Sequence, residues 1–166
     1  MRAVQCVEWG GPDRLLIAEI PSRPPGPASV RLRVRAAGLN FLDTLMIQGK
    51  YQAKPELPFT PGVEVAGKVI AVGAGVTRFA PGARAIGLPT TGGFADEVVL
   101  PEAACHALPD GIGFEVAAGF ALVYGTAWHA LRDRGALRPG ERLLVLGAGG
   151  GAGLAAVDLG AAMDAR

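Results

Sequence analysis

The sequence predicts a mostly β domain over residues 1–120, followed over residues 121–166 by the beginning of an α/β domain with a doubly wound parallel sheet. Up to about residue 110, short apolar runs are cut by glycine and proline at close intervals, which is typical of a small barrel or sandwich. After Pro109-Asp110-Gly111 the apolar period becomes helical, and the chain then enters an apolar stretch that ends in glycines.

Turn residues divide the β region into elements. Gly10-Gly11-Pro12 is the first turn, and the proline-rich residues 21–27 form an extended connector. Residues 29–36 alternate strictly, with three apolar side chains facing inward and three arginines on a solvated face. Gly67 is expected at a bulge. The expected strands are residues 1–6, 29–36, 62–72, 81–86 and 94–100, and the expected helices are 114–120 and 123–131.

The stretch from Leu143 to Leu146 has the length of a strand and is followed by glycines and an Ala/Leu helical pattern. This order is typical of the phosphate-binding turn of a nucleotide fold, since glycines allow the turn, the approach of backbone N–H groups to a pyrophosphate and close packing of the helix. A glycine-rich loop without a ligand is the alternative for an isolated motif. The residues predicted to contact a dinucleotide are Ala148, Gly149, Gly150, Gly151, Ala152 and Gly153.

Two registers of the fingerprint fit this turn. One is Gly147-x-Gly149-x-x-Ala152, and the other is Ala148-x-Gly150-x-x-Gly153. The second is preferred, because it places Gly153 where the helix packs and leaves Gly147 to end the strand. The acidic residue that would bind the ribose is expected about 20 positions further on, beyond Arg166, so the sequence leaves NADP(H) and NAD(H) both open.

Composition excludes several classes of function. The 16 basic and 15 acidic residues are interspersed, which argues against nucleic-acid binding. No apolar run reaches membrane-spanning length and the start lacks the apolar centre of a signal peptide, so we expect a cytoplasmic protein. Cys6 and Cys105 have no C-x-x-C spacing, so they form neither a disulfide framework nor a cysteine-built zinc site.

Several stretches together resemble the medium-chain dehydrogenase/reductase superfamily, and within it the zinc-independent, zeta-crystallin-like quinone oxidoreductase branch. The resemblance covers nearly the whole chain in the family's order. It implies a GroES-like barrel followed by a Rossmann domain, with the active site in the cleft between them, and a homodimer when the protein is full length. The matching stretches are residues 37–44, 61–67, 73–76, 79–84, 93–96, 126–131 and the glycine turn.

Departures from the zinc alcohol dehydrogenases narrow the expected chemistry. Those enzymes have a cysteine where this chain has Asn40 and a histidine where it has Val63, and neither residue here replaces a thiolate or an imidazole on Zn²⁺. No metal site is therefore expected. The resemblance implies hydride transfer from NADP(H) to a quinone or an α,β-unsaturated carbonyl compound, with the protein mainly orienting the reactants.

Two candidate catalytic residues follow from the resemblance. It places Asn40 at the nicotinamide edge, where its amide can bond the cofactor or the substrate carbonyl, although Asn40 can equally N-cap a helix over residues 41–48 with Asp43 at N3. Tyr51 follows a stretch similar to enoyl thioester reductases, whose tyrosine there assists catalysis, so enoyl-thioester reduction is the alternative activity; a surface tyrosine on a loop is the less favoured interpretation.

Thr126 is expected to start the helix beside the cofactor and reach the ribose or nicotinamide, or to be an ordinary helix-start threonine. Glu64 is expected to be a buried, hydrogen-bonded carboxylate. The 166 residues alone should be inactive, with uncovered apolar faces at 143–146 and 154–163. A non-catalytic structural protein built on the same fold remains the competing class.

Overall fold

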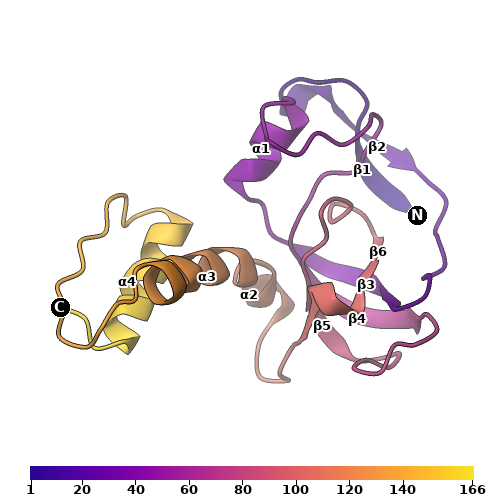
Figure 1. The fold of residues 1–166 in the computed structure, drawn as a ribbon. Coiled ribbons are helices and arrows are strands. Elements are labelled where there is room, and N and C mark those ends of the chain that lie inside the picture. Colours follow the sequence, from indigo (N-terminus) through magenta and orange to yellow (C-terminus); the bar gives the residue numbers. More distant parts are fainter. The chain divides into compact units, whose positions relative to one another are not determined.

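The computed structural model describes residues 1–166, which divide into two compact units, Met1–Gly119 and Phe120–Arg166 (Figure 1). The first unit contains every strand of the chain, and the second is helical. No helix is long and apolar enough to cross a membrane.

A five-stranded antiparallel sheet forms the centre of the first unit, in the order β6-β3-β4-β5-β7. Its strands β6 and β7 are edges that do not pair with each other, so the sheet is a half-barrel. A separate hairpin makes isolated bridges to two residues outside the sheet strands, from Ala3 to Ala95 and from Cys6 to Phe59. The strands are β1 (Arg2–Cys6) and β2 (Leu15–Glu19) of the hairpin, and β3 (Ser29–Ala37), β4 (Val65–Val72), β5 (Arg84–Gly87), β6 (Glu97–Pro101) and β7 (Cys105–Ala107).

Short helices connect these strands. Helix α1 (Phe41–Ile47) follows β3, and α2 (Phe114–Ala118) follows β7 and contacts β3 and β4. Single 3₁₀ turns lie at Pro12–Arg14 and Glu102–Ala104. The predicted strands and the helix after residue 40 are confirmed within a few residues, whereas β2 and β7 were not among the predicted elements.

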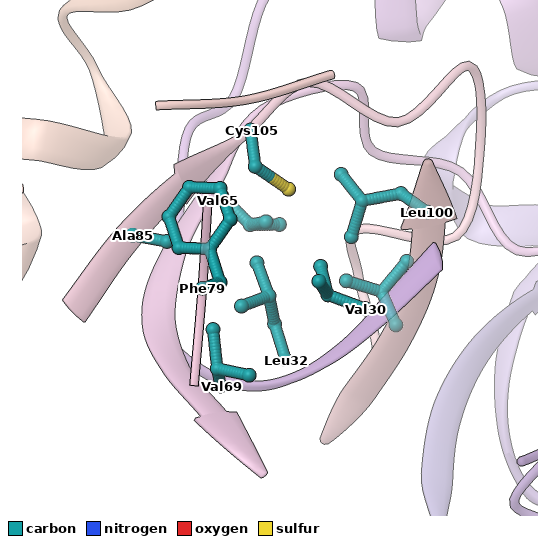
Figure 2. Packing of buried hydrophobic residues seen from close by; sticks show 9 residues of the cluster. Val30, Leu32, Val65, Val69, Phe79, Ala85, Leu100 and Cys105 are labelled. Carbon is teal, nitrogen blue, oxygen red and sulfur yellow. The ribbon is translucent and has the colours of Figure 1, made fainter. Parts of the chain in front are cut away.

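The core of the first unit is an apolar cluster on one face of the sheet (Figure 2). Val30 and Leu32 of β3 are fully buried, as the alternation of residues 29–36 predicts, because a strand presents every second side chain to the same face. Cys105 is buried there as a free thiol, and burial raises its pKa to about 11. The cluster comprises Val30, Leu32, Val65, Val69, Phe79, Ala85, Val98, Leu100 and Cys105.

The opposite face of β3 is only partly solvated. Arg33 and Arg35 are exposed, but Arg31 is half-buried and lies with Arg33 beside Glu97 of the neighbouring strand β6. The pKa of Glu97 is lowered mainly by a hydrogen bond from the Ser22 hydroxyl. The contact with Arg33 lowers it further, by a smaller amount. The expectation of a freely solvated arginine face is therefore wrong at Arg31, because pairing with β6 brings a carboxylate against it.

Two irregularities bend the pairing of β3 with β4. The register shifts between Arg31 and Leu32 and again between Val34 and Ala36. Gly67 lies at the second shift, where a Cβ atom would lie 2.1 Å from the Arg33 carbonyl oxygen. The predicted bulge is confirmed, with the extra residue on β3 opposite Gly67.

The second unit consists of a helical hairpin and the glycine turn. Helix α3 (Ala121–Trp128) continues as a π-helical segment (His129–Arg134), and α4 (Gly151–Ala162) packs against α3. The Tyr124 hydroxyl donates to Asp158 at 2.9 Å, and Phe120 stacks on Tyr124 with ring centroids 4.3 Å apart.

The strand expected at Leu143–Leu146 is not formed, and this prediction is wrong for the structure. A strand needs a neighbour to pair with, and the only ladder contacts here come from the last residue. The Arg166 N–H donates to the Glu141 carbonyl at 2.8 Å, and the Leu143 N–H donates to the Arg166 carbonyl at 2.8 Å. Exposure still alternates, with Leu144 83% and Leu146 86% exposed, so the predicted uncovered apolar face is confirmed.

Replacing Gly67 by alanine should destabilise the first unit by about 1–3 kcal/mol, because the added methyl group must displace the β3 backbone. Gly111→Ala is the matched control, since a Cβ atom there meets nothing within 4 Å. Urea unfolding followed by Trp9 fluorescence in a Trp128→Phe background measures the first unit alone. Equal midpoints for the two alanine variants would contradict the close approach at Gly67.

Candidate functional site

Asn40 lies at the junction of β3 and α1. It is the N-cap of α1, with extended backbone angles of −117° and 154°. The Asn40 N–H donates to the Asp43 carboxylate at 2.9 Å, and the Asp43 N–H donates to the Asn40 carbonyl at 3.0 Å. The predicted capping pair is confirmed; the role of Asn40 toward a cofactor or substrate stays a prediction.

Glu64 brings a second polar group to Asn40. Its side chain is completely buried, and its Oε2 accepts a hydrogen bond from Asn40 Nδ2 at 3.3 Å. The Gly38 N–H donates to the Glu64 carbonyl at 2.9 Å, which continues the β3–β4 ladder by one step beyond the pair Ala37–Val65. The expectation of a buried, hydrogen-bonded carboxylate is confirmed.

Gly38 permits this approach. A Cβ atom at position 38 would lie 3.0 Å from Glu64 Oε2 and 2.1 Å from the carbonyl oxygen of Ala118 at the end of α2. No side chain fits in that space without displacing the carboxylate or the helix. Gly38 was not among the predicted site residues, and the only signal for it in the sequence is a glycine two positions before Asn40.

Tyr51 lies beyond the opposite end of α1. The helix ends at Ile47, a turn with Gly49 at a φ of +66° follows, and Tyr51 is half-buried with no hydrogen bond from its hydroxyl. The seven residues of α1 span about 10 Å. The structure therefore places the two candidate catalytic residues at opposite ends of one short helix.

The glycine turn forms a bare helix N-terminus. Gly147 has a φ of +72° and ends the apolar stretch, and Gly150 is the N-cap of α4 without a side-chain cap. A Cβ atom at Gly153 would lie 2.3 Å from the Gly147 carbonyl oxygen, whereas Gly149 is unobstructed. This packing agrees with the preferred register, in which Gly153 is the glycine of helix packing.

Thr126 does not start a helix, so that expectation is wrong. Helix α3 begins at Ala121, and Thr126 lies in its second turn with an exposed side chain. The helix starts earlier because Phe120 already has helical backbone angles, −101° and −54°, with no capping side chain to mark the boundary.

Three surface cavities lie elsewhere on the first unit, and neither Asn40 nor Tyr51 lines any of them. Their volumes are about 580, 410 and 630 Å³. Arg31 and Glu97 line two of the three, on the face where they form an ion pair. No group of three or more His, Cys, Asp or Glu side chains is arranged to hold a metal ion. The side chains beside Asn40 are the carboxylates of Asp43 and Glu64, and they include neither a thiolate nor an imidazole, so the set does not fit the zinc sites of the zinc alcohol dehydrogenases.

Asp43 should make stability depend on pH. Burial raises the pKa of its carboxyl group, against a smaller opposing effect of the Asn40 N–H. The pKa of Asp43 is therefore higher in the folded than in the unfolded protein. The ionised Asp43 carboxylate destabilises the fold fully at pH values above its folded pKa, and this destabilisation is gone once the pH falls below its unfolded pKa.

The wild type should therefore gain stability relative to Asp43→Asn as the pH is lowered through the folded pKa. Urea unfolding of both proteins, followed by Trp9 fluorescence in the Trp128→Phe background, measures the difference. Trp9 is a suitable probe because its ring packs beside Gly49, just after α1. A difference that is independent of pH, or that grows in favour of Asp43→Asn on acidification, would contradict the assignment.

Comparison with known proteins identifies the fold and its relatives. Residues 26–110 match the alcohol dehydrogenase GroES-like domain. The chain is 44% identical over 163 residues to a quinone oxidoreductase-like protein 2 homolog of Nematostella vectensis, covering 96% of this chain and 44% of that protein. It thus spans less than half the length of that relative.

Solved structures of related proteins are similar to this chain over its whole length. The human synaptic vesicle membrane protein VAT-1 homolog-like protein superposes with a TM-score of 0.97 at 32% identity, over 100% of this chain and 54% of that one. The Escherichia coli quinone oxidoreductase, solved in complex with NADPH, superposes with a TM-score of 0.94 at 30% identity, over 100% of this chain and 51% of that one. The chain therefore belongs to the medium-chain dehydrogenase/reductase superfamily, with a GroES-like domain of the alcohol dehydrogenase type and relatives in the zinc-independent quinone oxidoreductase branch.

Proposed function

We propose that this chain is part of an NAD(P)H-dependent, zinc-independent oxidoreductase that transfers hydride to a quinone or an α,β-unsaturated carbonyl compound. The observation that carries the proposal is the uncapped N-terminus of α4 behind the glycine turn. The similarity to quinone oxidoreductases supports it at the level of the family.

The start of α4 suits the pyrophosphate of a dinucleotide. The helix is 12 residues long, its N-cap is a glycine, and no acidic residue lies in its first turn. The first intrahelical bond runs from the Leu154 N–H to the Gly150 carbonyl at 2.8 Å. The N–H groups of Gly151, Ala152 and Gly153 precede it and are free to bind an anion, which the helix dipole favours. NADPH, when bound, supplies the hydride.

We infer that the second unit is the first βα unit of a Rossmann domain. The Arg166 N–H bonds the carbonyl of Glu141, and the Arg166 carbonyl bonds the N–H of Leu143. One residue bonded to the two neighbours of Arg142 is the hydrogen-bond pattern of a parallel ladder. A second strand that ran parallel to residues 142–146 would make the same hydrogen bonds. The exposed Leu144 and Leu146 would be covered by the further layers of such a sheet.

Asn40 is the residue of the first unit that we assign to the reacting groups. Its amide has one N–H bonded to Glu64, which leaves the second to donate to a substrate carbonyl or to the nicotinamide. Tyr51 has a free hydroxyl that could donate to a developing enolate, and it keeps enoyl-thioester reduction as the second candidate activity. The expected homodimer and cytoplasmic location stay predictions.

A chimera tests the proposed activity. Residues 1–166 would replace the matching half of the Escherichia coli quinone oxidoreductase, whose remaining half supplies the rest of the fold. We expect NADPH oxidation with 1,4-benzoquinone, and with crotonyl-CoA instead if the second candidate is right. A chimera that folds and binds NADPH but turns over neither acceptor would favour a non-catalytic structural role.

The 166-residue chain alone should bind NADPH weakly or not at all. One exposed helix N-terminus contributes only about 0.3–1 kcal/mol to anion binding, far less than the many contacts that normally hold a dinucleotide. Calorimetric titration with NADPH measures this directly, with sedimentation to establish the oligomeric state. Micromolar binding by a monomer would show that the second unit is already a complete binding site.

A further inference from the structure

We propose that Glu64 is a positioning residue that fixes the orientation of the Asn40 amide, and thereby decides which of its atoms faces a ligand. The proposal rests on the proposed function, in which Asn40 bonds the cofactor or the substrate carbonyl. Its physical basis is the hydrogen bond from Asn40 Nδ2 to Glu64 Oε2.

The two ends of an asparagine amide have nearly the same shape but opposite hydrogen-bonding character. The nitrogen end only donates and the oxygen end only accepts. A carboxylate only accepts, so it pairs with the nitrogen end and repels the oxygen end. With Glu64 at 3.3 Å, the orientation with Nδ2 toward the carboxylate is the one that forms a bond.

The backbone around this pair leaves little room for adjustment. The Gly38 N–H holds the Glu64 carbonyl, and the Asn40 N–H is held by the Asp43 carboxylate. Glu64 is fully buried, and the missing side chain at Gly38 is what admits its Oε2. Because Glu64 is completely buried, its carboxylate is shielded from bulk water.

A fixed orientation of the Asn40 amide determines whether a ligand atom meets a donor or an acceptor. An amide held in one orientation presents its second N–H as a preformed donor, and a donor fixed in advance binds or catalyses better than one that must first be oriented. If the amide could flip, its other orientation would present oxygen to a carbonyl and repel it.

Glu64→Gln tests the proposal with the smallest change in shape. A glutamine can either accept from Nδ2 or, after turning, donate to Oδ1, so both orientations of Asn40 become allowed. Glu56→Gln is the matched control, because Glu56 is exposed. The readout is the pair of side-chain amide signals of Asn40 in proton–nitrogen NMR of the 166-residue chain, assigned by their loss in Asn40→Ala.

We expect one Asn40 amide proton to be shifted downfield in the wild type and in Glu56→Gln, and that shift to be lost or averaged in Glu64→Gln. In the chimera, Glu64→Gln should lower kcat/KM by about tenfold or more, with little change in thermal midpoint. An Asn40 signal that is the same in all three proteins would overturn the proposal. If the wild-type chimera is itself inactive, the proposed function fails while the NMR result still decides the role of Glu64.

A second pair of variants applies even if Glu64→Gln does not fold. Asn40→Asp would place a carboxylate against Glu64, whereas Asn40→Ser keeps a capping oxygen without the charge. At neutral pH we expect Asn40→Asp to unfold at a clearly lower temperature than Asn40→Ser. Equal unfolding temperatures would mean that Glu64 does not face position 40, and would overturn the proposal.

Discussion

The antiparallel pairing of β3 with β4 is the constraint on which the first unit depends. It places Val30 and Leu32 of β3 against Val65 and Val69 of β4 in one apolar cluster. The same ladder continues past the strands to the bond between the Gly38 N–H and the Glu64 carbonyl. A single register therefore determines both the core and the contact between two polar side chains that are 24 residues apart.

The two units differ in how far their extended segments are paired, although the first unit also exposes large apolar side chains, with Ile17, Leu39 and Phe41 each 77% exposed. In the first, the sheet has an apolar cluster on one face, and its buried carboxylates accept hydrogen bonds. In the second, Leu144, Leu146 and Leu154 are more than half exposed, and the segment 143–146 pairs only with Arg166. The chain spans about half the length of its relatives, and the activity is proposed for a longer assembly.

Local patterns predicted the local features and missed those set by long-range contacts. Strict alternation identified β3, and an asparagine followed three positions later by an aspartate identified the start of α1. The start of α3 at Ala121, well before Thr126, has no sequence signal because its N-cap, Phe120, has no capping side chain. Whether residues 143–146 form a strand depends on pairing with a neighbour, which the local pattern does not show. The contact of Glu64 with Asn40 depends on register, which a single sequence does not reveal.

Strand pairing holds Glu64 against Asn40, and a double-mutant cycle measures the contact between the two side chains. Stability is measured in the Trp128→Phe background for the unmutated pair, Asn40→Ala, Glu64→Ala and the double variant by urea unfolding with Trp9 fluorescence, since alanine, unlike glutamine, keeps no hydrogen bond to position 40. Because the cycle cancels the loss of the N-cap, it isolates the side-chain contact. We predict a coupling free energy of about 1 kcal/mol or more; a coupling of zero within error would contradict the account.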